Sequence, residues 1–175
     1  MSLGLRGPHR RGVLLGACAA VALVTPLFLA LLHPSTADLV ADARVAGLDR
    51  GELAFRVLVR IPLATALLEE IAFRAVLPAL WRPEGRAAAL VVPSLAFGLW
   101  HIVPTLDALH ANSPEASIVA RSAAVAGAVL VTGLAGVALI WFKERTRTLA
   151  APLAFHACLN SSATVAAWLA LGRAS

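Results

Sequence analysis

Apolar runs that are each about as long as a bilayer is thick constrain this chain more than any other feature. A membrane-crossing helix needs about 20 mainly apolar residues. The chain of 175 residues is 59% hydrophobic and 14% charged, whereas a soluble domain carries about 25% charged residues. We therefore predict an all-α fold, a polytopic transmembrane helical bundle that forms a single membrane domain over residues 1–175. About five spans are expected, at residues 13–32, 53–81, 87–103, 117–142 and 149–171.

The segments between the spans carry weaker signals. Residues 33–52 are mixed polar, and a short helix within 34–60 would raise the number of spans to six. Residues 104–115, which contain Pro, Asn and Ser, are expected to form a loop. Close helix packing is expected at three glycines of the fourth span, Gly127, Gly133 and Gly136.

The basic residues interrupt the apolar runs and do not gather on one face. The net charge is +5, and positive residues favour the cytoplasmic side of a membrane. Placing the N-terminus in the cytoplasm puts the basic residues near 6–11, 82–86 and 143–147 on that side, so we expect a multi-pass plasma-membrane protein whose surroundings are the lipid bilayer. Tyr is absent and no base-stacking surface is evident, which argues against nucleic acid as a partner. The Ala- and Arg-rich composition suggests a bacterial source.

Charged residues in the middle of the second span are costly and mark it as a functional site. A charge at the centre of a membrane helix costs about 2.5–3.5 kcal/mol on insertion scales. Glu70 and Arg74 are four residues apart, so they can neutralise each other on one helical face. Glu69 lies about 100° around the helix from Glu70 and has no such partner. A carboxylate in this position suits a general base.

Two further spans bring polar groups that can take part in proton transfer or hydrogen bonding. His101 lies one turn after Phe97 in the third span, and His156 lies one turn before Asn160 in the fifth. A lone membrane histidine is more often a packing residue than a catalytic one. Three spans that each contribute such groups, within a depth band of about 10 Å at 1.5 Å rise per residue, predict one shared cavity.

The three motifs resemble those of a known family. Glu-Glu-x-x-x-Arg at 69–74, Phe-x-x-x-His at 97–101 and His-x-x-x-Asn at 156–160 are similar to the motifs of the CPBP family, also called Abi. That family contains CAAX proteases and bacteriocin-processing enzymes, including the Rce-type CAAX endopeptidases. The resemblance covers about residues 63–167, the expected catalytic core. Ala75 stands where the family often has Gly, and family members commonly have more spans, so a homo-oligomer or partner is one way to complete the fold.

The resemblance implies an intramembrane endopeptidase that cleaves a membrane-associated protein or peptide. Glu69 and His101 would activate a water molecule, and Arg74 would hold Glu70 in place. His156 and Asn160 would stabilise the oxyanion, a role that is most effective where bulk water is excluded. A prenylated CAAX substrate is not expected in a bacterium.

Other functions remain open at this point. Glu69, His101 and His156 are a credible zinc set for a metalloprotease, but no His-Glu-x-x-His pairs the ligands on one helix, so a mechanism without a cofactor is favoured. A non-catalytic bacteriocin-immunity protein or scaffold is an alternative from another class. A proton-coupled transporter would use similar residues but predicts inverted repeats, which the sequence does not show.

Overall fold

The computed structural model describes residues 9–174, and all the regular structure in that range is helical. The elements in chain order are α1 (His9–Ala30), α2 (Pro34–Ala37), the 3-10 turn η1 (Ala43–Val45), α3 (Arg50–Phe55), the π-helical η2 (Arg56–Ala66), α4 (Leu67–Glu70), the π-helical η3 (Ile71–Val76), α5 (Leu77–Leu80), α6 (Arg86–Trp100), α7 (Ile102–Asn112), α8 (Ile118–Thr146) and α9 (Ala150–Ala174).

The helical membrane bundle expected from the sequence is confirmed. Within the described range, four helices are long and apolar enough to cross a membrane, at Arg10–Ala30, Arg86–Asn112, Ile118–Thr146 and Ala150–Gly172. The second predicted span is also helical throughout, from Arg50 to Leu80, and we call this stretch the α3–α5 rod. It is less apolar than the other four because it carries seven charged residues, Arg50, Glu52, Arg56, Arg60, Glu69, Glu70 and Arg74.

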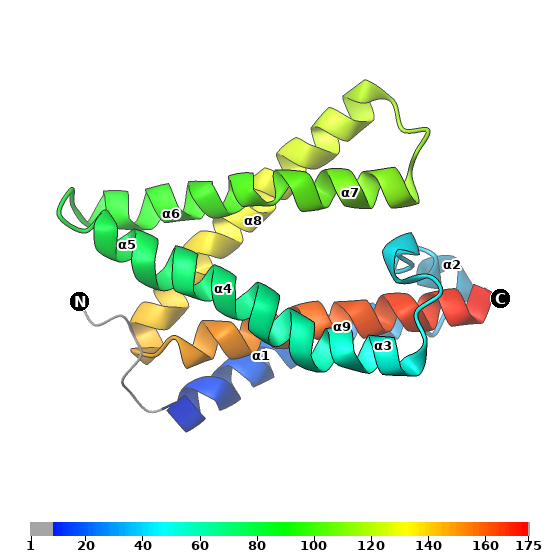
Figure 1. Ribbon diagram of the computed structural model, residues 1–175, viewed down its shortest axis with the longest axis horizontal. Coiled ribbons are helices and arrows are strands. Elements are labelled where there is room, and N and C mark those ends of the chain that lie inside the picture. Colours follow the sequence, from blue (N-terminus) through cyan, green and yellow to red (C-terminus); the bar gives the residue numbers. More distant parts are fainter. Residues whose placement is uncertain (1–8, 175) are drawn as a thin grey trace.

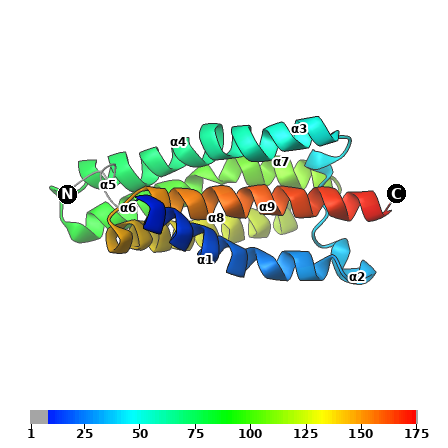
Figure 2. The same cartoon turned by 90° about the horizontal axis from the view of Figure 1, so that it is seen from below.

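The helices pack mainly in pairs (Figures 1 and 2). α1 lies along α9, and α6 packs against α8, which crosses it obliquely. The α3–α5 rod runs along the length of the bundle and contacts α9 through η2. The short helix expected within 34–60 is present as α2, but its four residues are far too few to cross a membrane.

Glycines allow the paired helices to approach closely. A Cβ atom on Gly98 of α6 would lie 2.6 Å from the carbonyl oxygen of Val129 in α8. A Cβ on Gly136 would lie 3.1 Å from Cα of Ser94. Close packing is therefore confirmed at Gly136, and Gly133 lies against the same crossing. The expectation is wrong for Gly127, where a Cβ would meet nothing within 4 Å.

The third predicted span continues further than the sequence indicated. Its helix turns at His101 and then resumes as α7, so most of the expected loop at 104–115 is helical. Pro104 has no N–H to donate to the carbonyl of Trp100, which favours the break. However, a proline is tolerated in the first turn of a helix, and Pro104 is the third residue of α7. The proline therefore marks a junction between two helices.

The polar segment between α1 and α3 is fixed at one end of the bundle. The Asn112 side chain at the end of α7 donates to Oδ1 of Asp42 at 3.0 Å and accepts from the N–H of Ala43 at 2.7 Å. Arg44 forms an ion pair with Asp42 at 2.6 Å. On the other side, the indole of Trp168 in α9 donates to the carbonyl of Leu48 at 2.9 Å. We call residues 39–45 the end loop.

Candidate active site

Glu70 lies at the centre of a buried charge cluster. Its side chain is fully buried, as is that of Arg74, and the nearest atoms of the pair are 3.5 Å apart. The Nδ1 atom of His156 in α9 lies 2.9 Å from Oε1 of Glu70. A carboxylate accepts, so this imidazole nitrogen carries the hydrogen and donates it. The predicted Glu70–Arg74 pair is thus present, and α9 adds a third member to it.

Glu69 is held by two other helices. The indole N–H of Trp100 at the end of α6 donates to Oε1 of Glu69 at 3.0 Å. The other oxygen, Oε2, lies 3.6 Å from Nε2 of His156. His156 therefore stands between the two glutamates, with one ring nitrogen facing each. With both carboxylates ionised, Glu69, Glu70 and Arg74 together carry one net negative charge.

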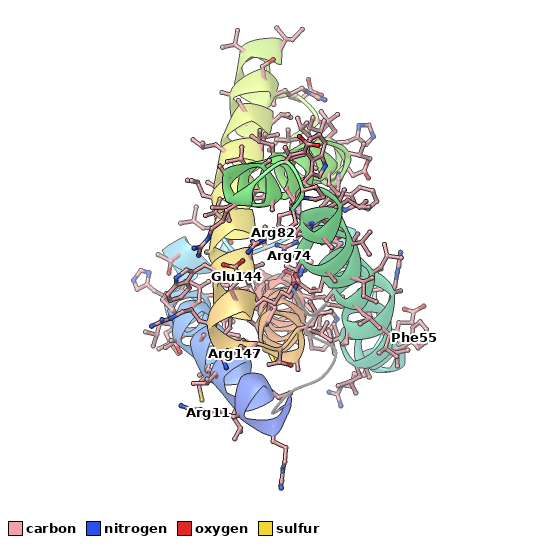
Figure 3. All side chains as sticks on the ribbon, turned by 90° about the vertical axis from the view of Figure 1, so that its left-hand side faces the viewer. Arg11, Phe55, Arg74, Arg82, Glu144 and Arg147 are labelled. Carbon is pink, nitrogen blue, oxygen red and sulfur yellow. The ribbon has the colours of Figure 1, made fainter. Side chains whose placement is uncertain are left out.

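Phe97 forms the apolar centre around which the polar groups are arranged. The Arg74 guanidinium lies over its ring, 3.8 Å from the centroid. The rings of His101 and His156 both meet Phe97 edge to face, at centroid distances of 4.6 and 6.1 Å. Figure 3 shows Arg74 pointing into the middle of the bundle. Phe97 thus sets the spacing between the two histidines and the arginine.

His101 is presented in one defined orientation. Its Nδ1 atom lies 2.8 Å from the carbonyl oxygen of Phe97. Because a carbonyl can only accept, Nδ1 is the donor, and Nε2 of the neutral ring keeps a free lone pair. The helix turn at His101 gives the side chain this position between α6 and α7.

Three of the predicted site residues line one cavity. Glu69 of α4, His101 at the turn between α6 and α7, and Asn160 of α9 border a cavity of about 790 Å³. His156 does not line it and lies behind Glu69. The end loop and the side chains of Arg56 and Arg60 also line the cavity, so its wall is more polar and more positive away from Glu69.

The π-helical segment explains why one helix lines so much of this cavity. Arg56, Arg60, Thr65 and Glu69 all contribute to the wall. On an α-helix, the nine residues from Arg60 to Glu69 would place these two side chains about 180° apart. The hydrogen bonds of a π-helix run from residue i to i+5, so it turns more slowly. As a result η2 brings both side chains to the same face.

Several buried polar atoms of the site have no hydrogen-bond partner among the described residues. They are Oε2 of Glu69, Oε2 of Glu70 and the three guanidinium nitrogens of Arg74. Buried polar groups are normally satisfied, and exceptions concentrate where chemistry or ligand binding takes place. Of these three residues, only Glu69 lines the cavity.

The residues of the alternative zinc set are not gathered as metal ligands in the part of the chain that the structure describes. Nowhere in residues 9–174 do three His, Cys, Asp or Glu side chains gather in a group that could hold a metal ion. Glu69, His101 and His156 have their ring and carboxylate atoms directed to Trp100, Phe97 and Glu70 instead. We therefore derive no step through a metal.

Sequence reasoning missed two contributors to this site. Trp100 was not singled out, although it is the neighbour of His101 and its indole holds Glu69. Lys143 was read only as a topology signal, yet its side chain is buried and contacts the α3–α5 rod. An indole or ammonium group in an apolar span requires a polar partner, and that requirement was the signal available in the sequence.

Comparison with known proteins gives one result. A family model described as "Type II CAAX prenyl endopeptidase Rce1-like" matches residues 51–162. This range covers the α3–α5 rod almost completely, all of α6 to α8 and the part of α9 that carries His156 and Asn160. No curated protein and no solved structure matches the chain.

Proposed function

This chain belongs to the Rce1-like family of type II CAAX prenyl endopeptidases, and from that premise we propose that it is an intramembrane endopeptidase that uses Glu69 as its base. The observation that carries the proposal is that Glu69 of α4, His101 at the turn between α6 and α7, and Asn160 of α9 line a single cavity inside the bundle. Glu69 is the one acid of the three motifs that lines this cavity.

In the first step Glu69 removes a proton from a water molecule bound in the cavity. Trp100 donates to Oε1 at 3.0 Å, and Oε2, which is buried beside His156 and has no hydrogen-bond partner among the described residues, accepts from a water that enters the site. The lone pair on Nε2 of His101 accepts the second hydrogen and orients the water toward the substrate. The water oxygen then forms a bond to the scissile carbonyl carbon, and the C=O π electrons move onto the carbonyl oxygen.

In the second step the tetrahedral intermediate collapses. The side-chain amide of Asn160 donates to the oxyanion from the cavity wall, where exclusion of bulk water strengthens the interaction. The C–N bond breaks as Glu69 returns its proton to the departing amine. We assign His156 to orienting both glutamates, because its two ring nitrogens face Glu69 and Glu70. A contribution of His156 to the oxyanion stays a prediction from the sequence.

The proposed substrate is a membrane-associated protein or peptide. Much of the outer surface of the spans is apolar, including Leu95, Leu99 and Leu130, so lipid surrounds the site and a lipid-anchored chain shares its environment. The cavity wall formed by Arg56 and Arg60 is positive. An extended substrate that carries negative charge on one side of the cleaved bond suits this arrangement. We place the N-terminus in the cytoplasm on the distribution of basic residues.

The decisive experiment compares membrane peptides from cells that carry the wild type, Glu69→Gln, or no copy of the gene. We expect specific peptides, or shortened membrane proteins, that are present with the wild type and absent in the other two. Glu69→Gln preserves size and the acceptor for Trp100 but removes the base. Identical profiles for wild type and a folded Glu69→Gln protein would disprove hydrolysis and would favour a scaffold or immunity role.

A further inference from the structure

The α3–α5 rod contains two prolines, and each one deprives a main-chain carbonyl of its usual donor. Arg74 lies near the end of the π-helical η3, where the rod returns to the α-helical α5, and in the α-helical register its carbonyl would accept from residue 78, which is Pro78 and has no N–H. In a π-helix the carbonyl of Val57 would accept from residue 62, which is Pro62. A helix inside a membrane cannot leave such groups to water. Both carbonyls therefore need a hydrogen-bond donor from outside the rod's own main chain.

Each of these carbonyls receives a side-chain hydrogen bond from a different neighbouring helix. The Nζ atom of Lys143 in α8 donates to the carbonyl of Arg74 at 2.8 Å. The hydroxyl of Ser161 in α9 donates to the carbonyl of Val57 at 2.8 Å. The two contacts lie on either side of Glu69 along the rod. They join the rod to α8 and to α9, and α9 also lines the cavity.

Lys143 is the more informative of the two donors. Lys143 is only 4% exposed. Among residues 9–174, no ion pair includes it. A buried ammonium without a carboxylate partner is costly. Arg145, two residues later, is exposed and has its guanidinium near the ring of Trp141. A basic residue at the end of a membrane helix normally keeps its charged group at the surface in this way. Lys143 instead points inward to a proline-freed carbonyl.

We propose that Lys143 and Ser161 are positioning residues that hold the α3–α5 rod through the carbonyls freed by Pro78 and Pro62, and so set where Glu69 stands relative to Trp100 and His101. Neither residue touches the proposed reaction centre. Arg74 thus has its main-chain carbonyl bonded to α8 and its side chain paired with Glu70. A shift of the rod by about 1 Å would be enough to reduce catalysis by about a hundredfold.

The test is a double-mutant cycle that restores the missing donor. Lys143→Met keeps the length of the side chain and removes its hydrogens, whereas Pro78→Ala returns an N–H to the rod at the position that serves the Arg74 carbonyl. We expect Lys143→Met alone to lower the rate of peptide release by about tenfold or more. The same substitution should lower it by less than about twofold when Pro78→Ala is already present. Arg145→Met removes a charge from the same helix end and should change little.

A second readout does not depend on the proposed activity. The indole N–H of Trp100 donates to Glu69, so its NMR signal in the detergent-solubilised protein reports the position of Glu69. Trp100→Phe identifies that signal among those of the four tryptophans. Lys143→Met should shift it, and adding Pro78→Ala should return it toward its original position. This result would stand even if no peptide release were found for any form of the protein.

Clear outcomes would overturn the inference. An unmoved indole signal in Lys143→Met, or a defect that Pro78→Ala does not relieve, would show that the carbonyl contact has no positioning role. If Lys143→Met cannot be recovered as folded protein, the double variant should be recoverable, and its failure would count equally against the proposal. Ser161→Ala with and without Pro62→Ala repeats the test on α9, with Ser162→Ala as its matched control.

Discussion

The Nδ1 atom of His156 lies 2.9 Å from Oε1 of Glu70, although 86 positions of sequence separate the two residues. The contact joins α9 to the α3–α5 rod inside the bundle, where Glu70 and Arg74 are fully buried. A buried charge is tolerated only with partners. Glu70 therefore differs from its neighbour Glu69, which has no ion pair with Arg74 and which lines the cavity.

The two adjacent glutamates should respond differently to the same substitution. Glu70→Gln leaves the Arg74 guanidinium without its carboxylate, and removing one partner of a buried pair costs about 3–5 kcal/mol. Glu69→Gln keeps an acceptor for Trp100 and should change stability by less than about 1 kcal/mol. Thermal unfolding in detergent measures both. Equal midpoints for the two variants would contradict the separation into a structural and a reactive carboxylate.

Trp100→Phe should weaken catalysis without unfolding the protein. The substitution removes the indole donor to Glu69 but keeps an aromatic ring beside Phe73, whose ring centroid is 5.9 Å from that of Trp100. Loss of one hydrogen bond that fixes a general base should lower kcat about tenfold and leave KM nearly unchanged. The assay can use a quenched fluorescent peptide once the cleaved sequence is known. Trp141→Phe, at an exposed position on α8, is the matched control.

Peptide release should persist after metal chelation. The proposed steps use only side chains of this chain, so treatment with a strong zinc chelator should leave the rate within about twofold of the untreated enzyme. Elemental analysis of the purified protein should find well below one zinc per chain. Loss of activity on chelation, with recovery on adding zinc alone, would instead establish the metalloprotease alternative.

The end loop should stay bound to the end of α7 down to an unusually low pH. Hydrogen bonding from Arg44, helped by Asn112 and opposed by burial, lowers the pKa of Asp42 from 3.8 to about 2. A lowered carboxyl pKa means that the stabilisation is fully present above pH 3.8 and is lost as the pH falls toward 2. Because the ion pair is partly exposed, it contributes about 1 kcal/mol or less.

Pepsin digestion at pH 4 and at pH 2 can follow this change. We expect cleavage within the end loop of the wild type to accelerate at pH 2, and Asp42→Ala to be cleaved rapidly at both values. Equal protection of wild type and variant at pH 4 would show that Asp42 does not hold the loop.

The sequence predicted those parts of this structure that depend on local spacing. Apolar runs located the helices, and the four-residue interval between Glu70 and Arg74 predicted their pairing, which the structure confirms at 3.5 Å. It could not predict how His156 meets the glutamates, because that depends on the relative depth and rotation of two helices. The π-helical turns of the rod also alter rise and rotation per residue, so a depth estimate that assumed 1.5 Å per residue could only bring the groups within a broad band.

The sequence also did not predict that the helix would resume after a turn at His101. Pro104 correctly signalled an interruption, but a proline near a helix start and a proline in a loop look alike in sequence. Trp100 was missed for a related reason. Its role depends on a hydrogen bond to a residue 31 positions away, and no periodicity within α6 reveals such a partner.

The polar wall of the cavity bears on how a hydrolase surrounded by lipid obtains one of its reactants. Each turnover consumes a water molecule, which hydrocarbon does not readily supply. Asp42, Arg56, Arg60 and Asn112 line the part of the cavity that extends from Glu69 toward the end loop. These side chains can hydrate a continuous path from the aqueous phase to Glu69. Arg56 and Arg60 are costly in a membrane helix, and supplying water to the site along this path would account for their presence.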